Sequence, residues 1–167
     1  GDDFFRGGDV KSAINAYSAA LDIDDEFAPC LSNRSACYLR LGQFEDCRSD
    51  CTAALALYTQ EMKSGDSGND RTNMKKTIAK LQLRRGAASC HMGLYADAKS
   101  DYDSARIDLN GSHGNGIDEL VAQIDRDREI LEKLAEMDAV KRRGDAAFAE
   151  GELTEAMSLY TEALTQV

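Results

Sequence analysis

Two basic side chains and one amide have the types and spacing that bind an acidic peptide. Lys80 and Arg84 are one helical turn apart, so on a helix they point the same way. Arg84 could hold a carboxylate with its planar fork, and Lys80 could attract one as a point charge. Asn33 could hold the terminal carboxylate or the backbone of the same peptide. The alternative is that Lys80 and Arg84 are solvated charges and Asn33 is a packing amide.

The other reactive side chains predict no catalytic or metal site. The chain has five cysteines and two histidines, His91 and His113. No two cysteines form a Cys-x-x-Cys pair, and two isolated histidines supply too few ligands for a metal. Cys47 and Cys51 lie one turn apart at positions where a helix would bury them, as small hydrophobic residues in a reducing cytosol. We therefore expect no enzyme activity, no metal and no cofactor.

Composition favours an all-helical protein. The 167 residues include one proline and no tryptophan, and Ala, Leu, Glu, Lys and Arg are abundant. The net charge of −10 argues against general binding of nucleic acid, which carries negative charge itself. No apolar run has the length of a membrane span, so we expect no membrane partner.

One short pattern recurs four times and explains which elements position these residues. Each copy has a small residue, a turn glycine, a second small residue, a tyrosine or cysteine, and an alanine. The copies are Gly1, Gly8, Ala13, Tyr17, Ala20; Ser35, Gly42, Cys47, Cys51, Ala54; Gly86, Gly93, Ala98, Tyr102, Ala105; and Gly144, Gly151, Ala156, Tyr160, Ala163. A fixed period with insertions predicts stacked units of helix, tight turn and helix.

The residues of this pattern resemble the tetratricopeptide repeat. The turn glycine permits a left-handed backbone, the small residues let the two helices approach closely, and the tyrosine fills the space between neighbours. The resemblance implies an all-α right-handed superhelix of antiparallel helix pairs. We expect helices at about 2–7, 9–22, 27–41, 43–60, 72–92, 94–108, 117–149 and 152–166.

The repeats predict three segments along the chain. Residues 1–110 would hold three repeats, the first of them truncated, with a polar loop inserted at about 61–73. Residues 111–140 would be a joint followed by a capping and linking helix. Residues 141–167 would be a fourth repeat that could open a second array. Because no breaker interrupts the helical apolar period after Ile117, we expect one continuous helix from 117 to 149.

The peptide-binding residues are similar to the carboxylate clamp of co-chaperones with these repeats. The match lies in two segments, Leu31-Ser-Asn-Arg-Ser-Ala-Cys-Tyr38 and Lys80-Leu-Gln-Leu-Arg-Arg-Gly86. The resemblance implies that Asn33, Lys80 and Arg84 bind the acidic C-terminal tail of heat-shock chaperones of the 90-kDa or 70-kDa class. The clamp's first-repeat asparagine falls on Asp2, and an acid there would repel a carboxylate.

A narrower set of residues resembles the repeat domain of the dyslexia-susceptibility type axonemal dynein assembly factors. It comprises Arg71-Thr-Asn-Met-Lys75, Arg84-Arg-Gly86, Leu94-Tyr95 and Val121 to Ile130. This resemblance implies a cytoplasmic co-chaperone that preassembles dynein arms, with dynein chains as clients. Two other functions stay open: a scaffold that binds an internal peptide or helix, and the regulatory domain of an enzyme whose catalytic part lies elsewhere.

Overall fold

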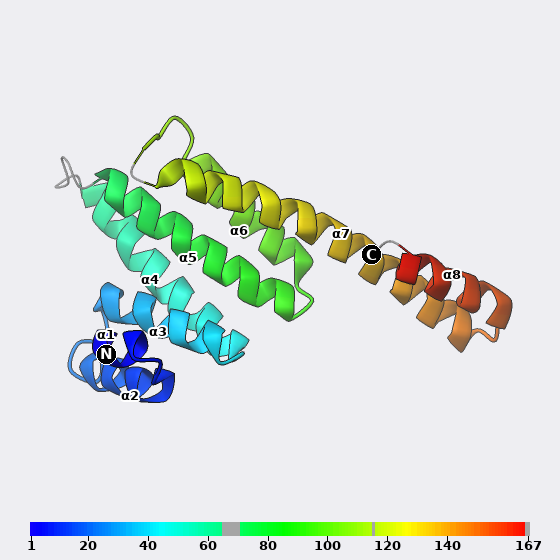
Figure 1. Cartoon of the computed structure of the whole chain (residues 1–167), viewed down its shortest axis with the longest axis horizontal. Coiled ribbons are helices and arrows are strands. Elements are labelled where there is room, and N and C mark those ends of the chain that lie inside the picture. Colours follow the sequence, from blue (N-terminus) through cyan, green and yellow to red (C-terminus); the bar gives the residue numbers. More distant parts are fainter. Residues whose placement is uncertain (65–70, 115, 166–167) are drawn as a thin grey trace. The chain divides into compact units, whose positions relative to one another are not determined.

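The computed structural model describes residues 1–64, 71–114 and 116–165, and in these residues every regular element is an α-helix (Figure 1). The helices are α1 (Asp2–Arg6), α2 (Val10–Leu21), α3 (Ala28–Arg40), α4 (Phe44–Ser64), α5 (Arg71–His91), α6 (Tyr95–Asp108), α7 (Ile117–Ala149) and α8 (Leu153–Thr165). The all-α class is thereby confirmed.

The four predicted turns share one geometry. Gly8, Gly42, Gly93 and Gly151 have φ values of 84°, 73°, 73° and 86°, in the left-handed region where glycine is least strained. In each turn the residue after the glycine donates its N–H to a carbonyl five residues earlier, at 2.9 Å. These bonds are Asp9 to Phe4, Gln43 to Tyr38, Leu94 to Ser89 and Glu152 to Ala147. This hydrogen bond closes the first helix of each pair and lets the second begin at once.

Close approach of the two helices in a pair explains the small residues and the tyrosines. Ala13, Cys47 and Ala98 are fully buried. A Cβ atom added at Gly86 would lie 2.5 Å from Cε1 of Tyr102, and one added at Gly144 would lie 2.7 Å from Cε1 of Tyr160. Both distances are too short for a side chain, so each glycine faces the ring of its own repeat.

The ends of two helices differ from the expectation. The inserted loop was predicted at about 61–73, but α4 continues to Ser64 and α5 begins at Arg71. The polar composition of these ends suggested a loop, yet both are extensions of helices whose apolar faces pack in the core through Leu55, Met74 and Ile78. The remainder of the predicted loop, residues 65–70, lies outside the described residues.

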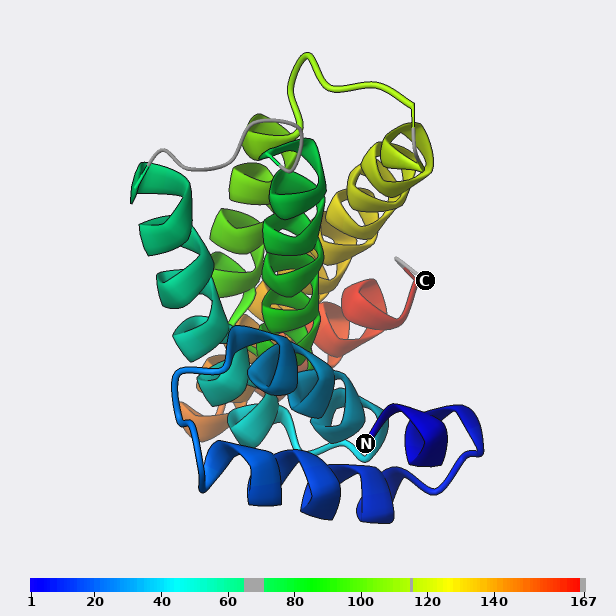
Figure 2. The same ribbon diagram turned by 90° about the vertical axis from the view of Figure 1, so that its left-hand side faces the viewer.

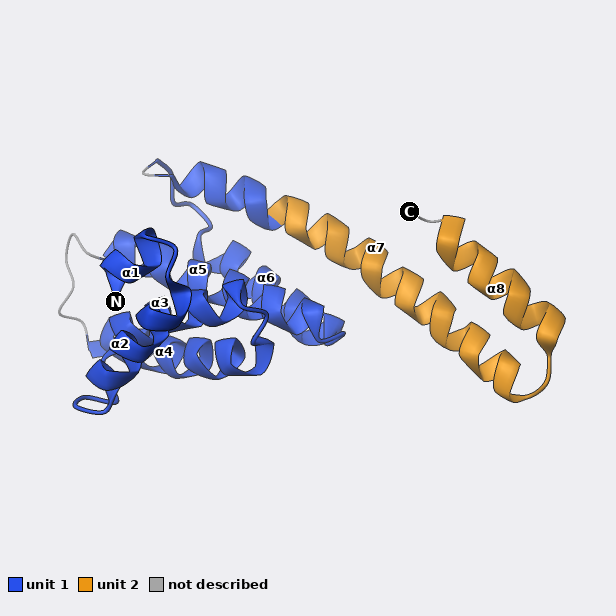
Figure 3. Cartoon of the chain, turned by 60° about the horizontal axis from the view of Figure 1, so that its bottom comes forward, with its two compact units in different colours: residues 1–124 blue, residues 125–167 orange. Residues whose placement is uncertain are grey.

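The chain has two compact units, residues 1–124 and 125–167 (Figure 3). In the first unit α4, α5 and α6 lie side by side, and α3 packs against α4 and α5 (Figure 2). The second unit has a small core of Val140, Ala147, Ala156 and Leu159. Helix α7 is continuous over the predicted range, and the boundary between the units falls within it. The predicted division into three repeats, a linking helix and a fourth repeat remains a prediction.

Candidate peptide-binding site

The first predicted site residue, Asn33, lies beside Asp2. Helix α3 presents Asn33 on an exposed face, and its Nδ2 donates a hydrogen bond of 3.1 Å to Oδ1 of Asp2. The hydroxyl of Tyr17 donates to the same carboxylate oxygen. Burial raises the pKa of the Tyr17 hydroxyl, and its hydrogen bond to Asp2 raises it further, so this group stays a donor at neutral pH. Asp2 is therefore held by two donors within the chain.

A small hollow surrounds this cluster. Its lining includes Phe5, Arg6 and Ala36 together with Asp2, Tyr17 and Asn33. Arg6 is exposed and lies 3.9 Å from Asp3, too far for a strong ion pair. It brings a positive charge to the hollow in repeat one. Neither Arg6 nor the Tyr17 hydroxyl was predicted as part of a site, because the repeat pattern assigns the tyrosine to the space between helices.

Arg84 of α5 bonds to α3 close to Asn33 in the sequence. Its Nη1 donates to the carbonyl oxygen of Ser32 at 2.8 Å and to Oγ of Ser35 at 2.9 Å. Both acceptors belong to α3, so the guanidinium is fixed next to the backbone that carries Asn33. Among the residues that the structure describes, no acceptor takes a hydrogen bond from Nε or Nη2 of Arg84, and these donors can serve a ligand.

Lys80 precedes Arg84 by one turn of α5 and is exposed. It forms no ion pair with any residue in the described ranges. The structure thus brings Asp2 into contact with Asn33 and places Arg84 beside the same helix. Lys80 is related to Asp2, Asn33 and Arg84 only by its position on α5, one turn before Arg84.

The second unit repeats the arrangement around Asp2. The hydroxyl of Tyr160 donates to Oδ1 of Asp145 at 2.9 Å, and Nζ of Lys141 donates to Oδ2 at 2.8 Å. These two bonds, the one from Lys141 first, lower the pKa of the Asp145 carboxyl. In each unit, therefore, the aspartate that directly follows a glycine accepts a hydrogen bond from a tyrosine 15 residues later: Asp2 from Tyr17, and Asp145 from Tyr160.

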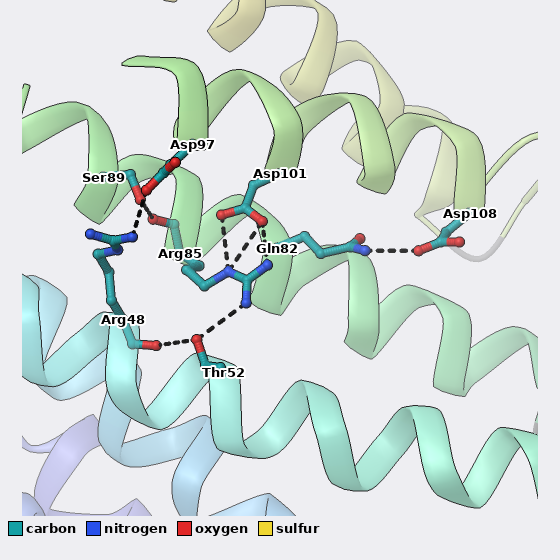
Figure 4. Close-up of polar contacts among 8 residues, drawn as sticks. All are labelled: Arg48, Thr52, Gln82, Arg85, Ser89, Asp97, Asp101 and Asp108. Atoms are coloured by element: carbon teal, nitrogen blue, oxygen red, sulfur yellow. Dashed lines mark hydrogen bonds and ion pairs between the residues drawn. The ribbon is translucent and has the colours of Figure 1, made fainter. Parts of the chain in front are cut away.

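Two buried ion pairs hold the helices that carry the site. Arg34 donates Nε and Nη2 to the two carboxylate oxygens of Asp50, each at 2.8 Å. Arg85 forms the same kind of pair with Asp101 (Figure 4). Each aspartate follows its arginine by 16 residues. This repeated interval of 16 residues is the sequence signal for both pairs, neither of which was predicted.

The described residues form neither a metal-ligand cluster nor a membrane-spanning helix. No group of three or more His, Cys, Asp or Glu side chains there has the arrangement of a metal site. No helix there has the length and apolar character needed to cross a membrane. Cys47 and Cys51 are free thiols and fully buried, as predicted.

Comparison with curated proteins gives relatives of two kinds, although no protein-family model matches the chain. The chain is 28% identical over 169 residues to Hsp70-Hsp90 organizing protein 1 of Glycine max, which covers 96% of this chain and 27% of that protein. It is 30% identical over 105 residues to Dynein axonemal assembly factor 4 of Rattus norvegicus, which covers 63% of this chain and 23% of that protein. The chain therefore spans about a quarter of the length of these relatives.

Solved structures show the fold. The TPR domain of Arabidopsis OM64 aligns with a TM-score of 0.53 and 22% identity, over 75% of this chain and 88% of that one. The second TPR domain of human RPAP3, in complex with the HSP70 peptide SGPTIEEVD, aligns with a TM-score of 0.53 and 23% identity, over 74% and 88%. The chain has the all-α tetratricopeptide-repeat fold and resembles the Hsp70-Hsp90 organizing proteins and dynein axonemal assembly factor 4.

Proposed function

We propose that this chain is an adaptor that binds the acidic C-terminal tail of heat-shock chaperones of the 70-kDa or 90-kDa class, and that it is no enzyme. The observation that carries the proposal is the position of Arg84, which α3 holds beside Asn33 with two hydrogen bonds. The exposed Lys80 lies one turn away on the same face of α5. The similar RPAP3 domain binds an HSP70 peptide that ends in Glu-Glu-Val-Asp.

The chemistry of the three residues suits such a tail. Nε and Nη2 of Arg84 can form a two-point bond with one carboxylate, and Lys80 can attract a second. The Asn33 amide carries two hydrogens, and Asp2 takes only one of them. The remaining N–H can donate to the terminal carboxylate or to the peptide backbone.

The proposal extends to the cellular role. The similarity to dynein axonemal assembly factor 4 supports a co-chaperone that acts in the cytoplasm during preassembly of axonemal dynein arms. In that role the clamp would hold the chaperone, and dynein chains would be the clients. Co-precipitation of a dynein chain with the whole protein, abolished by disruption of the clamp, would support this extension.

Charge reversal at Lys80 tests the clamp directly. We expect Lys80→Glu to weaken binding of a peptide ending in Glu-Glu-Val-Asp at least about tenfold, because an attractive charge becomes repulsive beside the ligand's carboxylates. Isothermal titration calorimetry measures the dissociation constant. Lys11→Glu is the matched control, since Lys11 is equally an exposed helical lysine, on α2. Equal weakening by both variants would mean that only the net charge matters.

Asp2 sets the strength of the clamp. We expect Asp2→Asn to tighten binding of the peptide about fivefold, because the substitution removes a negative charge beside the bound carboxylate. It also removes the charged acceptor that now takes a hydrogen bond from the Asn33 amide. The same titration measures the change. Asp3→Asn, which alters an exposed neighbouring aspartate, is the control. An unchanged dissociation constant for Asp2→Asn would show that Asp2 does not face the peptide.

A further inference from the structure

A second and larger groove lies on α4 and α5, apart from the clamp. Its volume is ≈ 1070 Å³. Residues of α4, among them Ala56, Met62 and Lys63, line it together with residues of α5, among them Arg71, Lys75 and Gln82, and with Asp108 of α6. A volume at the upper limit of small-molecule sites suits a segment of polypeptide better than a metabolite.

The groove and the clamp use opposite faces of α5. With 100° of rotation per residue, Lys75, Ile78, Gln82 and Arg85 share one face of this helix. Lys80 and Arg84 lie on the other face by the same rotation, and the groove's lining includes neither of them. A ligand in the groove would therefore leave the clamp free.

The groove is basic in a chain whose net charge is −10. Its lining has four cations and one acid, Asp108. Arg85 is bonded to Asp101 and Thr52, as Figure 4 shows, and Asp108 accepts a hydrogen bond of 2.8 Å from Gln82. The other three cations, Lys63, Arg71 and Lys75, have no ion pair with any residue in the described part of the chain. Together they form a positive edge that complements an acidic ligand.

A buried acceptor in the lining identifies the kind of donor that the ligand must bring. Gln82 is 8% exposed, and its Nε2 is used by Asp108. Its Oε1 is buried and has no hydrogen-bond partner in the described residues. A buried acceptor without a partner is costly, and a backbone N–H of an extended peptide would satisfy it once the Gln82 side chain turns toward the groove. Ala56, which is exposed, and Met62, which is half-buried, offer apolar surface for the peptide's side chains.

We propose that this groove binds an extended acidic segment of a partner protein. Its apolar side chains lie on Ala56 and Met62, its carboxylates lie at Lys63, Arg71 and Lys75, and a backbone N–H donates to Oε1 of Gln82. Such a segment is recognised along its length and needs no free C-terminus. The adaptor then holds two different peptides at once, one on each face of α5.

The test uses a probe that the clamp cannot hold. The probe is a fluorescent peptide with alternating glutamate and leucine, acetylated at its N-terminus and amidated at its C-terminus, and fluorescence anisotropy measures its dissociation constant. We expect Lys75→Glu to weaken binding at least about tenfold, and Arg71→Glu, at an exposed site, to act in the same direction. Lys80→Glu and Lys11→Glu should each change binding less than about twofold, the effect of net charge alone.

Each outcome of this test decides the proposal. Loss of binding with Lys75→Glu or Arg71→Glu, together with a shift of the Gln82 side-chain amide in nuclear magnetic resonance spectra, supports it. Equal weakening by Lys80→Glu, or equal binding of a probe in which lysine replaces glutamate, would overturn it. Equal binding of a uridine oligonucleotide would overturn it too, in favour of a general polyanion site. Because the probe has no free carboxyl terminus, failure here leaves the clamp untouched.

Discussion

Gly86→Ser is expected to destabilise the first unit by about 2 kcal/mol. A Cβ atom at position 86 would lie 2.5 Å from Cε1 of Tyr102 and 3.3 Å from the backbone oxygen of Ala98. The ring is 4% exposed and the carbonyl belongs to α6, so neither can move without loss of packing. Urea unfolding followed by circular dichroism measures the free energy of unfolding.

The second repeat supplies the compensating change for this prediction. There the chain itself has Ser35 and Cys51, both fully buried, at the positions of Gly86 and Tyr102. The double variant Gly86→Ser/Tyr102→Cys should therefore be more stable than the sum of its single changes by about 1–2 kcal/mol. Strict additivity would contradict the close contact of glycine and ring.

Asp50→Asn is expected to destabilise the first unit by about 2–3 kcal/mol. The Asp50 side chain is 7% exposed and accepts two bonds from Arg34, which also donates to Ser18 at 2.9 Å. The amide keeps the shape of the carboxylate but leaves a guanidinium, 19% exposed, without its counter-charge. Urea unfolding again gives the change.

The exposed pair of Arg48 and Asp97 is the control for Asp50→Asn. Its side chains are 29% and 56% exposed, at the same N···O distance of 2.8 Å. Asp97→Asn should cost less than about 1 kcal/mol, because exposed ion pairs contribute little. Similar losses for the two variants would show that burial of the pair does not decide its contribution.

The sequence predicted the fold because its repeat pattern reflects local geometry. Gly8, Gly42, Gly93 and Gly151 were assigned to turns, and each has positive φ. The tyrosines were assigned to the space between helices, and Tyr17 and Tyr102 are buried there. Such residues repeat in step with the helices, so a single chain with four copies shows them. The ends of α4 and α5 were missed because polar residues continue a helix as readily as they form a loop.

The candidate site was only partly predictable. Helical spacing placed Lys80 and Arg84 on one face of α5, but no spacing predicts that Arg84 bonds to the backbone of α3 across 52 residues. The bond between Asn33 and Asp2 likewise crosses from one repeat to another. The groove with Gln82 was not predicted, because its cations come from two helices and its unsatisfied acceptor exists only after packing.

Calorimetry with one peptide in two forms tests the central claim most directly. The peptide is SGPTIEEVD, with either a free or an amidated C-terminus. A clamp formed by Asn33, Lys80 and Arg84 predicts that the free form binds with a dissociation constant of about 1 μM, roughly −8 kcal/mol, and more weakly as salt is raised. It predicts no measurable binding of the amidated form. Equal affinity for the two forms would contradict a carboxylate clamp and favour a scaffold that binds internal peptides.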